Sequence, residues 1–590
     1  MIGVVADPAD WPVVKEFFEL FKTPWELARP GRVYEVLLIA GNEAYDCDSK
    51  LTLVYSSAPR KEDMALRLTA GPLLAHTLVM FAGRELPLYG PVQTFAGAGA
   101  VVLRSAESDQ AAGVKLMSDG RPFVRLGYDL FQEIARLLSA GQPAEHAAIP
   151  ALELHIAILR HCIVEAGIDL VEIPPVPAGH EFIVCLTHDI DFFGIRNHRF
   201  DHTFFGFLYR ATAGAALDFL RGKISFRRLA QNWQAVLKVP LVHLGLARDF
   251  WLSFEWYLNV EHGLPATYFF IPFKGRAGEQ VPGPGPSRRA APYDVAEHRG
   301  WLEKLLAAGC EVGVHGIDAW HDVAGGRAEL AKITSLVGSP GAGIRMHWLL
   351  HNHQTPQTLD EAGYTYDSTA GYNEAVGYRC GTVQVFRPGG AKQLLELPLH
   401  IQDGALFYRG RLGLSEEAAW QRCQTMLDNA QEFGGVLTLL WHDRSPGPER
   451  FWGDFYARLV KELRGRKVWF ASGSQAVSWF RKRRDVILEQ VGDIVRMRRV
   501  SQADGAAGQD NTPSLRVRYH AAQGCDFEPI ELPWADGEDI NLAALRNRSA
   551  SRTQSGARVA ETATRPEGGV YAASTPASGW QKHQTARLAP

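Results

Sequence analysis

The sequence predicts an α/β fold in which parallel strands alternate with helices, arranged either as a barrel or as a doubly wound sheet. Between residues 179 and 490, short apolar runs rich in β-branched and aromatic residues recur, and a helical pattern follows them. This alternation indicates parallel β/α units, because parallel strands need a crossover connection that is usually a helix. Ionisable residues stand directly after several runs, and we expect them to meet, because parallel strands deliver their carboxyl ends to one face. The runs are Phe182 to Leu186, Ala266 to Ile271, Glu311 to Val314, Leu394 to Leu397, Val436 to Trp441 and Val468 to Ala471.

The rest of the chain divides into a companion domain before this region and a tail after it. At 590 residues, the chain exceeds one ordinary domain. Residues 1–178 mix short apolar runs with helical patterns and end in the proline-rich stretch Ile173 to Pro177, so we expect an α/β companion domain and a stiff linker. Residues 491–590 are rich in Ala, Gly, Ser, Thr, Gln and Arg. This composition predicts a C-terminal extension that is mostly disordered, apart from a strand-like run at Leu515 to Tyr519.

An aromatic-rich segment, residues 200–262, interrupts the alternation of strands and helices. Its pattern is mostly helical, and it contains the runs Phe204 to Tyr209 and Phe250 to Leu252. We expect an inserted group of helices that packs over the predicted sheet or barrel. A surface that faces lipid is the alternative interpretation, because apolar and aromatic helix faces are also typical of membrane interfaces.

Composition and charge disfavour some classes of function. Lys and Arg number 62 against 65 Asp and Glu, a formal charge of -3, so no nucleic-acid partner is predicted. The seven cysteines are scattered without a C-x-x-C pair, which is typical of reduced cysteines in the cytoplasm. The first residues lack the pattern of an export signal, and no apolar run is long enough to cross a bilayer. We therefore expect a cytoplasmic protein without a transmembrane segment; its oligomeric state does not follow from the sequence.

Two carboxylates stand at the end of the first predicted strand, in Leu186-Thr187-His188-Asp189-Ile190-Asp191. Where a strand passes into a loop, both side chains can turn toward one site. One carboxylate can then bind a cation while the other serves as a base. Taken alone, such a pair is more commonly part of a solvated loop or a helix cap.

Further candidates for chemistry follow later strands. His315 and His321 come after the run Glu311 to Val314, and two imidazoles with one carboxylate make a three-ligand site that suits Zn²⁺ or a similar divalent ion. His442 follows the run that ends at Trp441, where it can give a proton to a leaving amine. Arg345 would hold a neighbouring carboxylate ionised and oriented. For each residue alone, an ordinary polar loop position is the alternative.

In their order and approximate spacing, these motifs resemble those of the polysaccharide deacetylase (NodB-type) family of carbohydrate esterases. The matching residues are Thr187-His188-Asp189-Ile190-Asp191, His315 with its glycine-rich surroundings, Arg345 and Leu440-Trp441-His442, within roughly residues 180 to 480. The resemblance implies an incomplete (β/α) barrel with a divalent metal, usually zinc, on one Asp and two His side chains. By position it implies the following roles: Asp189 as general base, Asp191 and His315 as metal ligands, Arg345 as the residue that tethers the base, and His442 as general acid.

The third metal ligand departs from the family pattern. The family spaces its two His ligands four residues apart, but this position is Ala319 here and the next histidine is His321. Six residues on a regular helix would rotate the second ring well away from the first, so His321 can bind only from an irregular loop. Asp318 is the competing ligand. We favour His321, because nitrogen ligands suit zinc.

The activity that the resemblance implies is the metal-dependent removal of an N-acetyl or similar acyl group from a sugar. A cytoplasmic enzyme would meet carbohydrate precursors, linked to a lipid or to a nucleotide, rather than a finished wall polymer. Two alternatives remain open. One is hydrolysis of a formamide or another non-peptide carbon–nitrogen bond, and the other is a non-catalytic family member that binds carbohydrate.

Overall fold

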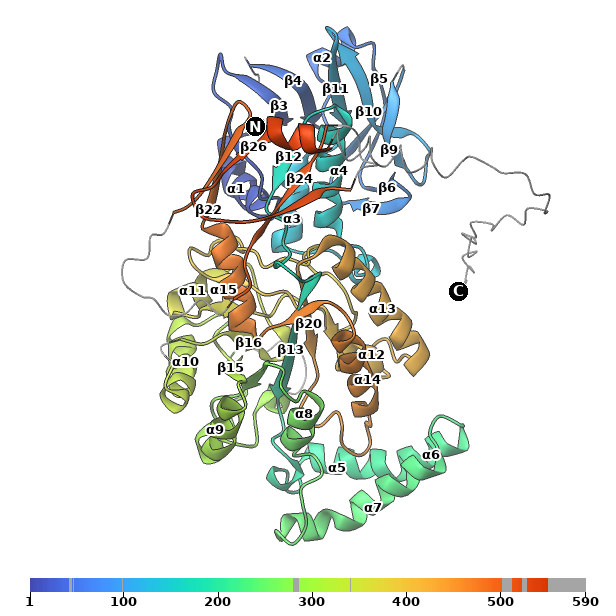
Figure 1. Cartoon of the computed structure of the whole chain (residues 1–590). Helices are drawn as coiled ribbons and strands as arrows, with labels where there is room; N and C mark the ends of the chain where they lie inside the picture. Colours follow the sequence, from blue (N-terminus) through green and yellow to red (C-terminus); the bar gives the residue numbers. More distant parts are fainter. Residues whose placement is uncertain are drawn as a thin grey trace, which may run out of the picture. The chain divides into compact units, whose positions relative to one another are not determined.

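The computed structural model describes residues 1–549 except 42–44, 46, 98, 280–285, 340, 501–511 and 523–527. Residues Met1–Leu542 form one compact unit, and Ala543–Pro590 form a second. All helices and strands named below belong to the first unit (Figure 1). No helix in the described ranges combines the length and the apolar composition that crossing a membrane requires.

A curled sheet of parallel strands forms the core of residues 182–470. The strands lie in the order β18, β17, β16, β15, β14, β13, β20, β19, and β21 pairs with the first residues of β13. Within the described residues no pairing joins β18 to β19, so the barrel is open and the predicted incomplete (β/α) barrel is confirmed. The strands are β13 (Phe182–Ile190), β14 (Ala266–Phe270), β15 (Glu311–Gly316), β16 (Ile344–Met346), β17 (Tyr366–Asp367), β18 (Leu395–Glu396), β19 (Ile401–Gln402), β20 (Val436–Leu440) and β21 (Val468–Phe470).

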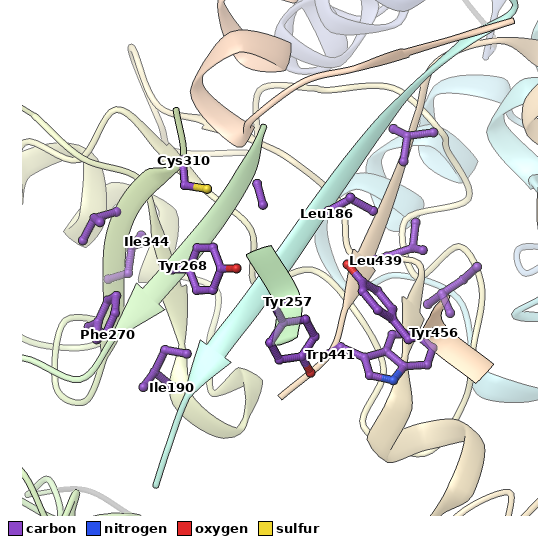
Figure 2. Close-up of a cluster of buried hydrophobic side chains, with 14 of the residues drawn as sticks. Leu186, Ile190, Tyr257, Tyr268, Phe270, Cys310, Ile344, Leu439, Trp441 and Tyr456 are labelled. Carbon is purple, nitrogen blue, oxygen red and sulfur yellow. The ribbon is translucent and has the colours of Figure 1, made fainter. Parts of the chain in front are cut away.

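Burial on both faces explains why these strands have continuous apolar runs. Every residue of β13, β14 and β20 is buried. A parallel strand that is covered on both sides must be apolar on both, unlike a half-exposed strand with its alternating pattern. Leu186, Tyr268 and Leu439 from these three strands meet in one hydrophobic cluster (Figure 2).

Helices connect and cover the strands. The connecting helices are α9 (Arg299–Ala307), α10 (Val323–Val337), α11 (Thr355–Ala362), α12 (Asp403–Phe407), α13 (Glu416–Phe433), α14 (Gly453–Arg464) and α15 (Gly473–Arg484). The segment predicted as a helical insertion contains α5 (His202–Tyr209), α6 (Ala215–Leu220), α7 (Phe226–His243) and α8 (Phe254–Val260). A π-helical turn, Arg210–Gly214, joins α5 to α6. A small separate cluster around Phe207, Val242 and Trp251 holds α5 and α7 together.

The N-terminal region has its own mixed sheet, in agreement with the predicted α/β companion domain. Strands β2, β1, β3, β4 and β11 pair in parallel, and the remaining strands pair antiparallel. The elements are β1 (Ile2–Val5), α1 (Trp11–Leu20), β2 (Trp25–Leu27), β3 (Val33–Ala40), β4 (Asp48–Tyr55), α2 (Lys61–Ala65), β5 (Thr69–Leu74), β6 (Thr77–Phe81), β7 (Arg84–Leu88), β8 (Val92–Ala96), β9 (Ala100–Ser105), β10 (Ala111–Ser118), β11 (Arg121–Leu126), α3 (Leu130–Ser139) and α4 (Ala151–Glu165). Buried polar contacts join this region to the barrel. Arg483 of α15 donates to the carbonyls of Leu20 and Ile173, and Glu153 accepts from Thr382.

The described part of the C-terminal extension is folded. Strands β22 (Val486–Val491), β23 (Ile494–Arg499) and β26 (Asp539–Asn541) form an antiparallel sheet, and β24 (Arg516–His520) lies between β12 (Leu170–Glu172) and β25 (Ile530–Pro533). The prediction of disorder is therefore wrong for most of the described part of 491–549, whereas 550–590 lie outside the described residues. The predicted strand-like run Leu515 to Tyr519 coincides with β24, in which His520 pairs with the distant Leu170. The composition of the segment gave no sign of β23, β25 and β26.

Candidate metal centre

Three side chains near the carboxyl ends of the barrel strands form a cluster with the spacing of a metal site. Asp191 follows β13, His315 lies in β15 and His347 follows β16. One ligand atom of each lies within 4.8 Å of the others. Asp191 Oδ1 is 3.3 Å from His315 Nε2 and 3.4 Å from His347 Nδ1, and these two ring nitrogens are 2.9 Å apart. One carboxylate and two imidazoles are a donor set that suits zinc.

The tautomer of His315 and the pKa shifts of Asp191 and His347 are compatible with binding of a cation. His315 Nδ1 lies 3.0 Å from the Arg345 carbonyl oxygen, so Nδ1 donates and the Nε2 lone pair points into the cluster. Burial alone would raise the pKa of Asp191, but the neighbouring histidines hold it well below its usual value. Burial lowers the pKa of His347, which favours the neutral ring. Asp191 Oδ1 is buried and has no hydrogen-bond partner among the described residues, which is consistent with a carboxylate oxygen that binds a cation.

His321, predicted as the third ligand, is not a member of this cluster. Its Nε2 is 3.4 Å from Asp318 Oδ1, and its ring packs edge-on against Trp320, with 4.7 Å between centroids. Asp318, the competing ligand, accepts a hydrogen bond from the backbone N–H of Glu279. The chain after β15 passes through a turn before α10 begins, so no helical turn carries a second histidine next to His315.

His347 takes the third position from the neighbouring strand. His315 of β15 is in register with Arg345 of β16, two residues before His347. The chain then turns sharply, since Trp348 and Leu349 have φ values of 65° and 53°, a region that residues other than glycine rarely adopt. Arg289 supports this turn, because its Nη2 donates to the His347 carbonyl at 3.2 Å. Arg345 was singled out in the sequence, but β16 has only three residues and was not predicted as a strand, so the rule of polar residues at strand ends did not indicate His347.

Asp189 lies next to the cluster and is held by Arg345. Side chains alternate along a strand, so Asp189 points to the same side of the chain as Asp191. Its Oδ1 accepts a hydrogen bond from Arg345 Nη1 at 2.9 Å, and its Oδ2 lies 3.8 Å from His315 Nε2. Arg345 is fully buried, and Ser368 fixes it through two further hydrogen bonds of 3.0 and 2.9 Å. The guanidinium therefore holds Asp189 in one orientation.

His442 approaches the cluster together with a carboxylate that the sequence did not reveal. His442 Nε2 is 3.9 Å from Asp191 Oδ2, and its Nδ1 is 2.6 Å from Asp403 Oδ1. Burial would lower the pKa of His442. The negative charges of Asp403, Asp191 and Asp189 have the larger, opposite effect and raise this pKa to about 9. Asp403 follows β19 directly, yet β19 has only two residues and gives no recognisable strand pattern.

His188, in the middle of the first motif, lies on the opposite face of β13. Its Nδ1 is 2.9 Å from the Trp441 carbonyl oxygen, and its Nε2 is 2.8 Å from Glu261 Oε1. The ring also packs against Tyr257 and Tyr268. His188 thus ties β13 to the segment after β20 and does not reach the cluster.

A cavity of about 170 Å³ opens at this site. Its lining includes Asp189, Asp191, His315, His347 and His442 together with Trp348, Tyr408, Arg411 and Arg450. The structure thus brings four residues singled out in the sequence, Asp189, Asp191, His315 and His442, to one cavity, with Arg345 behind Asp189. His321 is not in this lining.

The fold and the site define a class: an open parallel β/α barrel with an Asp–His–His cluster at the carboxyl ends of its strands. No family model and no curated protein match the chain. The solved structures that resemble it include candidate polysaccharide deacetylases, the family that the motifs resemble. One from Mycobacterium smegmatis is 19% identical over 52% of this chain and 94% of its own, with a TM-score of 0.32. One from Pseudomonas aeruginosa PAO1 is 15% identical over 52% and 95%, with a TM-score of 0.32, and PuuE allantoinase is 13% identical over 52% and 92%, with a TM-score of 0.31.

Proposed function

We propose that the protein is a metal-dependent hydrolase that removes an N-acetyl or similar acyl group from a sugar or a glycan precursor. The arrangement around Asp191 carries this proposal. Two histidines complete a three-ligand cluster, Asp189 lies 3.8 Å from one of them, and His442 lies 3.9 Å from Asp191. Amide hydrolysis needs an electrophilic activator, a base for water and an acid for the leaving amine. This cavity holds a candidate for each.

The cluster would hold a divalent cation, with zinc as the preferred ion. Asp191, His315 and His347 offer one oxygen and two nitrogen ligands, the set typical of a catalytic site with an open position. When bound, such a cation polarises the acyl oxygen and lowers the pKa of water. The Arg345 carbonyl keeps His315 in the tautomer that can bind it.

Asp189 and His442 would move the protons. Arg345 donates a hydrogen bond to Asp189 Oδ1, so Oδ2 would accept the proton from the water that attacks the acyl carbon. Asp403 accepts the Nδ1 hydrogen bond of His442, so Nε2 is the atom that gives a proton to the departing nitrogen. These roles agree with those implied by the motifs.

Two arginines at the cavity favour a substrate with an anionic group, such as the phosphate of a lipid-linked or nucleotide-linked sugar. The guanidinium carbons of Arg411 and Arg450 lie 5.5 and 4.9 Å from the ring centroid of Tyr408. Within the part of the chain that the structure describes, no carboxylate lies within 4.0 Å of either guanidinium, and Arg450 Nε lacks a hydrogen-bond partner. Burial would raise the pKa of Tyr408, but Arg450 and Arg444 lower it overall. Phosphate oxygens would accept hydrogen bonds from these two guanidinium groups.

Replacing Arg411 by glutamine is expected to raise the KM for an N-acetylhexosamine phosphate about 10- to 100-fold, the value of one charge-assisted hydrogen bond. The KM for neutral chitooligosaccharides should change little. The matched control is Arg458→Gln, because Arg458 also stacks on an aromatic ring, that of Trp420, but does not line the cavity. Steady-state kinetics measure the KM of each variant for both substrates. An equal rise of KM for the phosphorylated and the neutral substrate would refute phosphate recognition.

The proposed reaction is tested by measuring the acid that the purified protein releases from N-acetylated sugars. We expect acetate, its release to stop when the metal is chelated, and its return when Zn²⁺ is added. Turnover that survives chelation with no metal left in the protein would reject the mechanism. Formate from N-formyl sugars, without acetate, would instead favour the formamide hydrolase. Purification without chelator that yields no stoichiometric metal would favour a binding protein.

A further inference from the structure

The inserted helices expose large apolar side chains at a much higher density along the chain than the rest of the described residues. Of 24 large hydrophobic side chains that are exposed in the described residues, 12 lie between residues 200 and 246. Single exposed apolar residues are ordinary on a soluble protein, but a concentration of this kind marks an interaction surface. The 12 residues are Phe200, Phe205, Tyr209, Leu217, Phe219, Leu220, Phe226, Trp233, Leu237, Leu241, Leu244 and Leu246.

Helix α7 has two apolar faces, of which only one is covered. With about 100° between successive residues of a helix, the five exposed apolar residues from Phe226 to Leu244 fall within about 80° of one another. The buried residues centre on the opposite side of the helix. They are Leu229, Asn232, Ala235, Val239 and Val242. The exposed stripe is therefore a second face rather than the edge of a core. Leu237 and Leu244 on this face are 77% and 72% exposed.

The same segment is strongly basic. Residues 199–248 contain eight Lys or Arg and two Asp, a net charge of +6 in a chain whose net charge is -3. Both acids are already engaged, because Asp201 pairs with His198 and Asp218 pairs with Arg409. Three of the eight basic residues, Arg210, Arg228 and Arg248, pair with glutamates outside the segment. Arg227 and Lys238 lie on α7 at the border of the exposed stripe and form no ion pair within the described part of the chain.

We infer that this surface, formed by α5, α6 and α7, binds the face of an anionic lipid bilayer, with the apolar stripe in the acyl boundary and the basic residues at the headgroups. A helix that lies in the interface has this combination of an apolar face rich in Leu, Phe and Trp and flanking Lys and Arg. Figure 1 shows α6 and α7 side by side. A second copy of the chain fits less well, because a two-fold contact would place the exposed basic residues of one copy, such as Arg227 and Lys238, against the same surface of the other.

The lipid-binding surface is attached to the rim of the cavity. The backbone N–H of Glu449 donates to Asn232 Oδ1 of α7 at 2.7 Å, and Arg210 pairs with the Glu449 carboxylate. The next residue, Arg450, lines the cavity. Asn232 lies on the covered face of α7, so a bilayer bound to the exposed face would be linked to this side of the cavity through the helix itself. The lipid contact itself rests on the exposed stripe and the charge alone, and it does not depend on which reaction the cavity performs.

Flotation with vesicles tests this inference on the full chain. The wild-type protein should float with phosphatidylcholine vesicles that contain phosphatidylglycerol, float less with pure phosphatidylcholine, and be partly released by high salt. The double variant Leu237→Glu/Leu244→Glu should stay at the bottom of the gradient. The matched control is Val33→Glu/Met64→Glu, which changes two residues that are 71% and 84% exposed on the N-terminal region and should float like the wild type.

Three readouts keep the result unambiguous. The melting temperature of both double variants should match the wild type, since all four side chains are exposed. Should the leucine variant fail to fold, Arg227→Glu/Lys238→Glu gives the same test by reversing the charge of the rim. Hydrolysis of a soluble N-acetylated sugar should be unchanged in every variant, which separates lipid binding from the proposed reaction. The inference would be overturned if the wild type did not float, or if the leucine variant did. It would also be overturned if the wild type were a dimer in the absence of lipid and the leucine variant a monomer.

Discussion

Replacing His347 by alanine is expected to remove the bound metal and to lower kcat/KM by more than about 100-fold, because loss of an outer partner of a metal-bound histidine already costs about 10- to 100-fold. His347 Nδ1 lies 2.9 Å from His315 Nε2 and 3.4 Å from Asp191 Oδ1, so its removal leaves two ligands for the cation. Metal content by elemental analysis and kcat/KM for an N-acetylated substrate measure the two effects.

The control for this prediction is His321→Ala. His321 lies in the loop after the strand that contains His315, and it was favoured as a ligand because nitrogen ligands suit zinc, but its contacts are to Asp318 and Trp320. We expect this variant to keep its metal and most of its activity. The opposite pattern, with metal lost from the His321 variant and retained in the His347 variant, would show that the cluster is not the metal site.

Replacing Asp189 by asparagine is expected to lower kcat by about 10²- to 10⁴-fold, the contribution of a positioned general base. Asparagine has the same shape, and its side-chain oxygen can still accept the hydrogen bond of Arg345, so the fold and the metal should be retained. The KM should change less than kcat, because Asp189 would act in the proton transfer rather than in holding the sugar.

Asp318→Asn is the matched control for Asp189→Asn. It makes the same chemical change in a carboxylate of the loop after β15, outside the cavity lining. Near wild-type kcat is expected for it. If Asp189→Asn hydrolyses its substrate at the wild-type rate, or loses its metal, Asp189 is not the base and the assignment of the two carboxylates must be exchanged.

The strand ends account for most of what could be foreseen about the site. Asp189, Asp191, His315 and His442 stand after apolar runs that the structure forms as β13, β15 and β20, and they line one cavity. Parallel strands deliver their carboxyl ends to the same face, so this convergence follows from the pattern alone. Residues that follow very short strands could not be predicted in this way, because a strand of two or three residues has no recognisable sequence pattern. Asp403 after β19 is one such residue.

The sequence by itself determined the alternation of strands and helices, the open-barrel fold implied by its motifs, and the four polar residues that meet in the cavity. The third member of the Asp–His–His cluster was decided by tertiary structure. His347 reaches His315 because β16 lies beside β15 in register, a pairing between residues 30 positions apart that no local spacing encodes. The exposed face of α7 was decided in the same way. Its apolar residues are evident in the sequence, but only the packed structure shows which of its two faces is covered. Local patterns fix which elements form, and long-range pairing and burial decide which side chains meet and which remain free to bind.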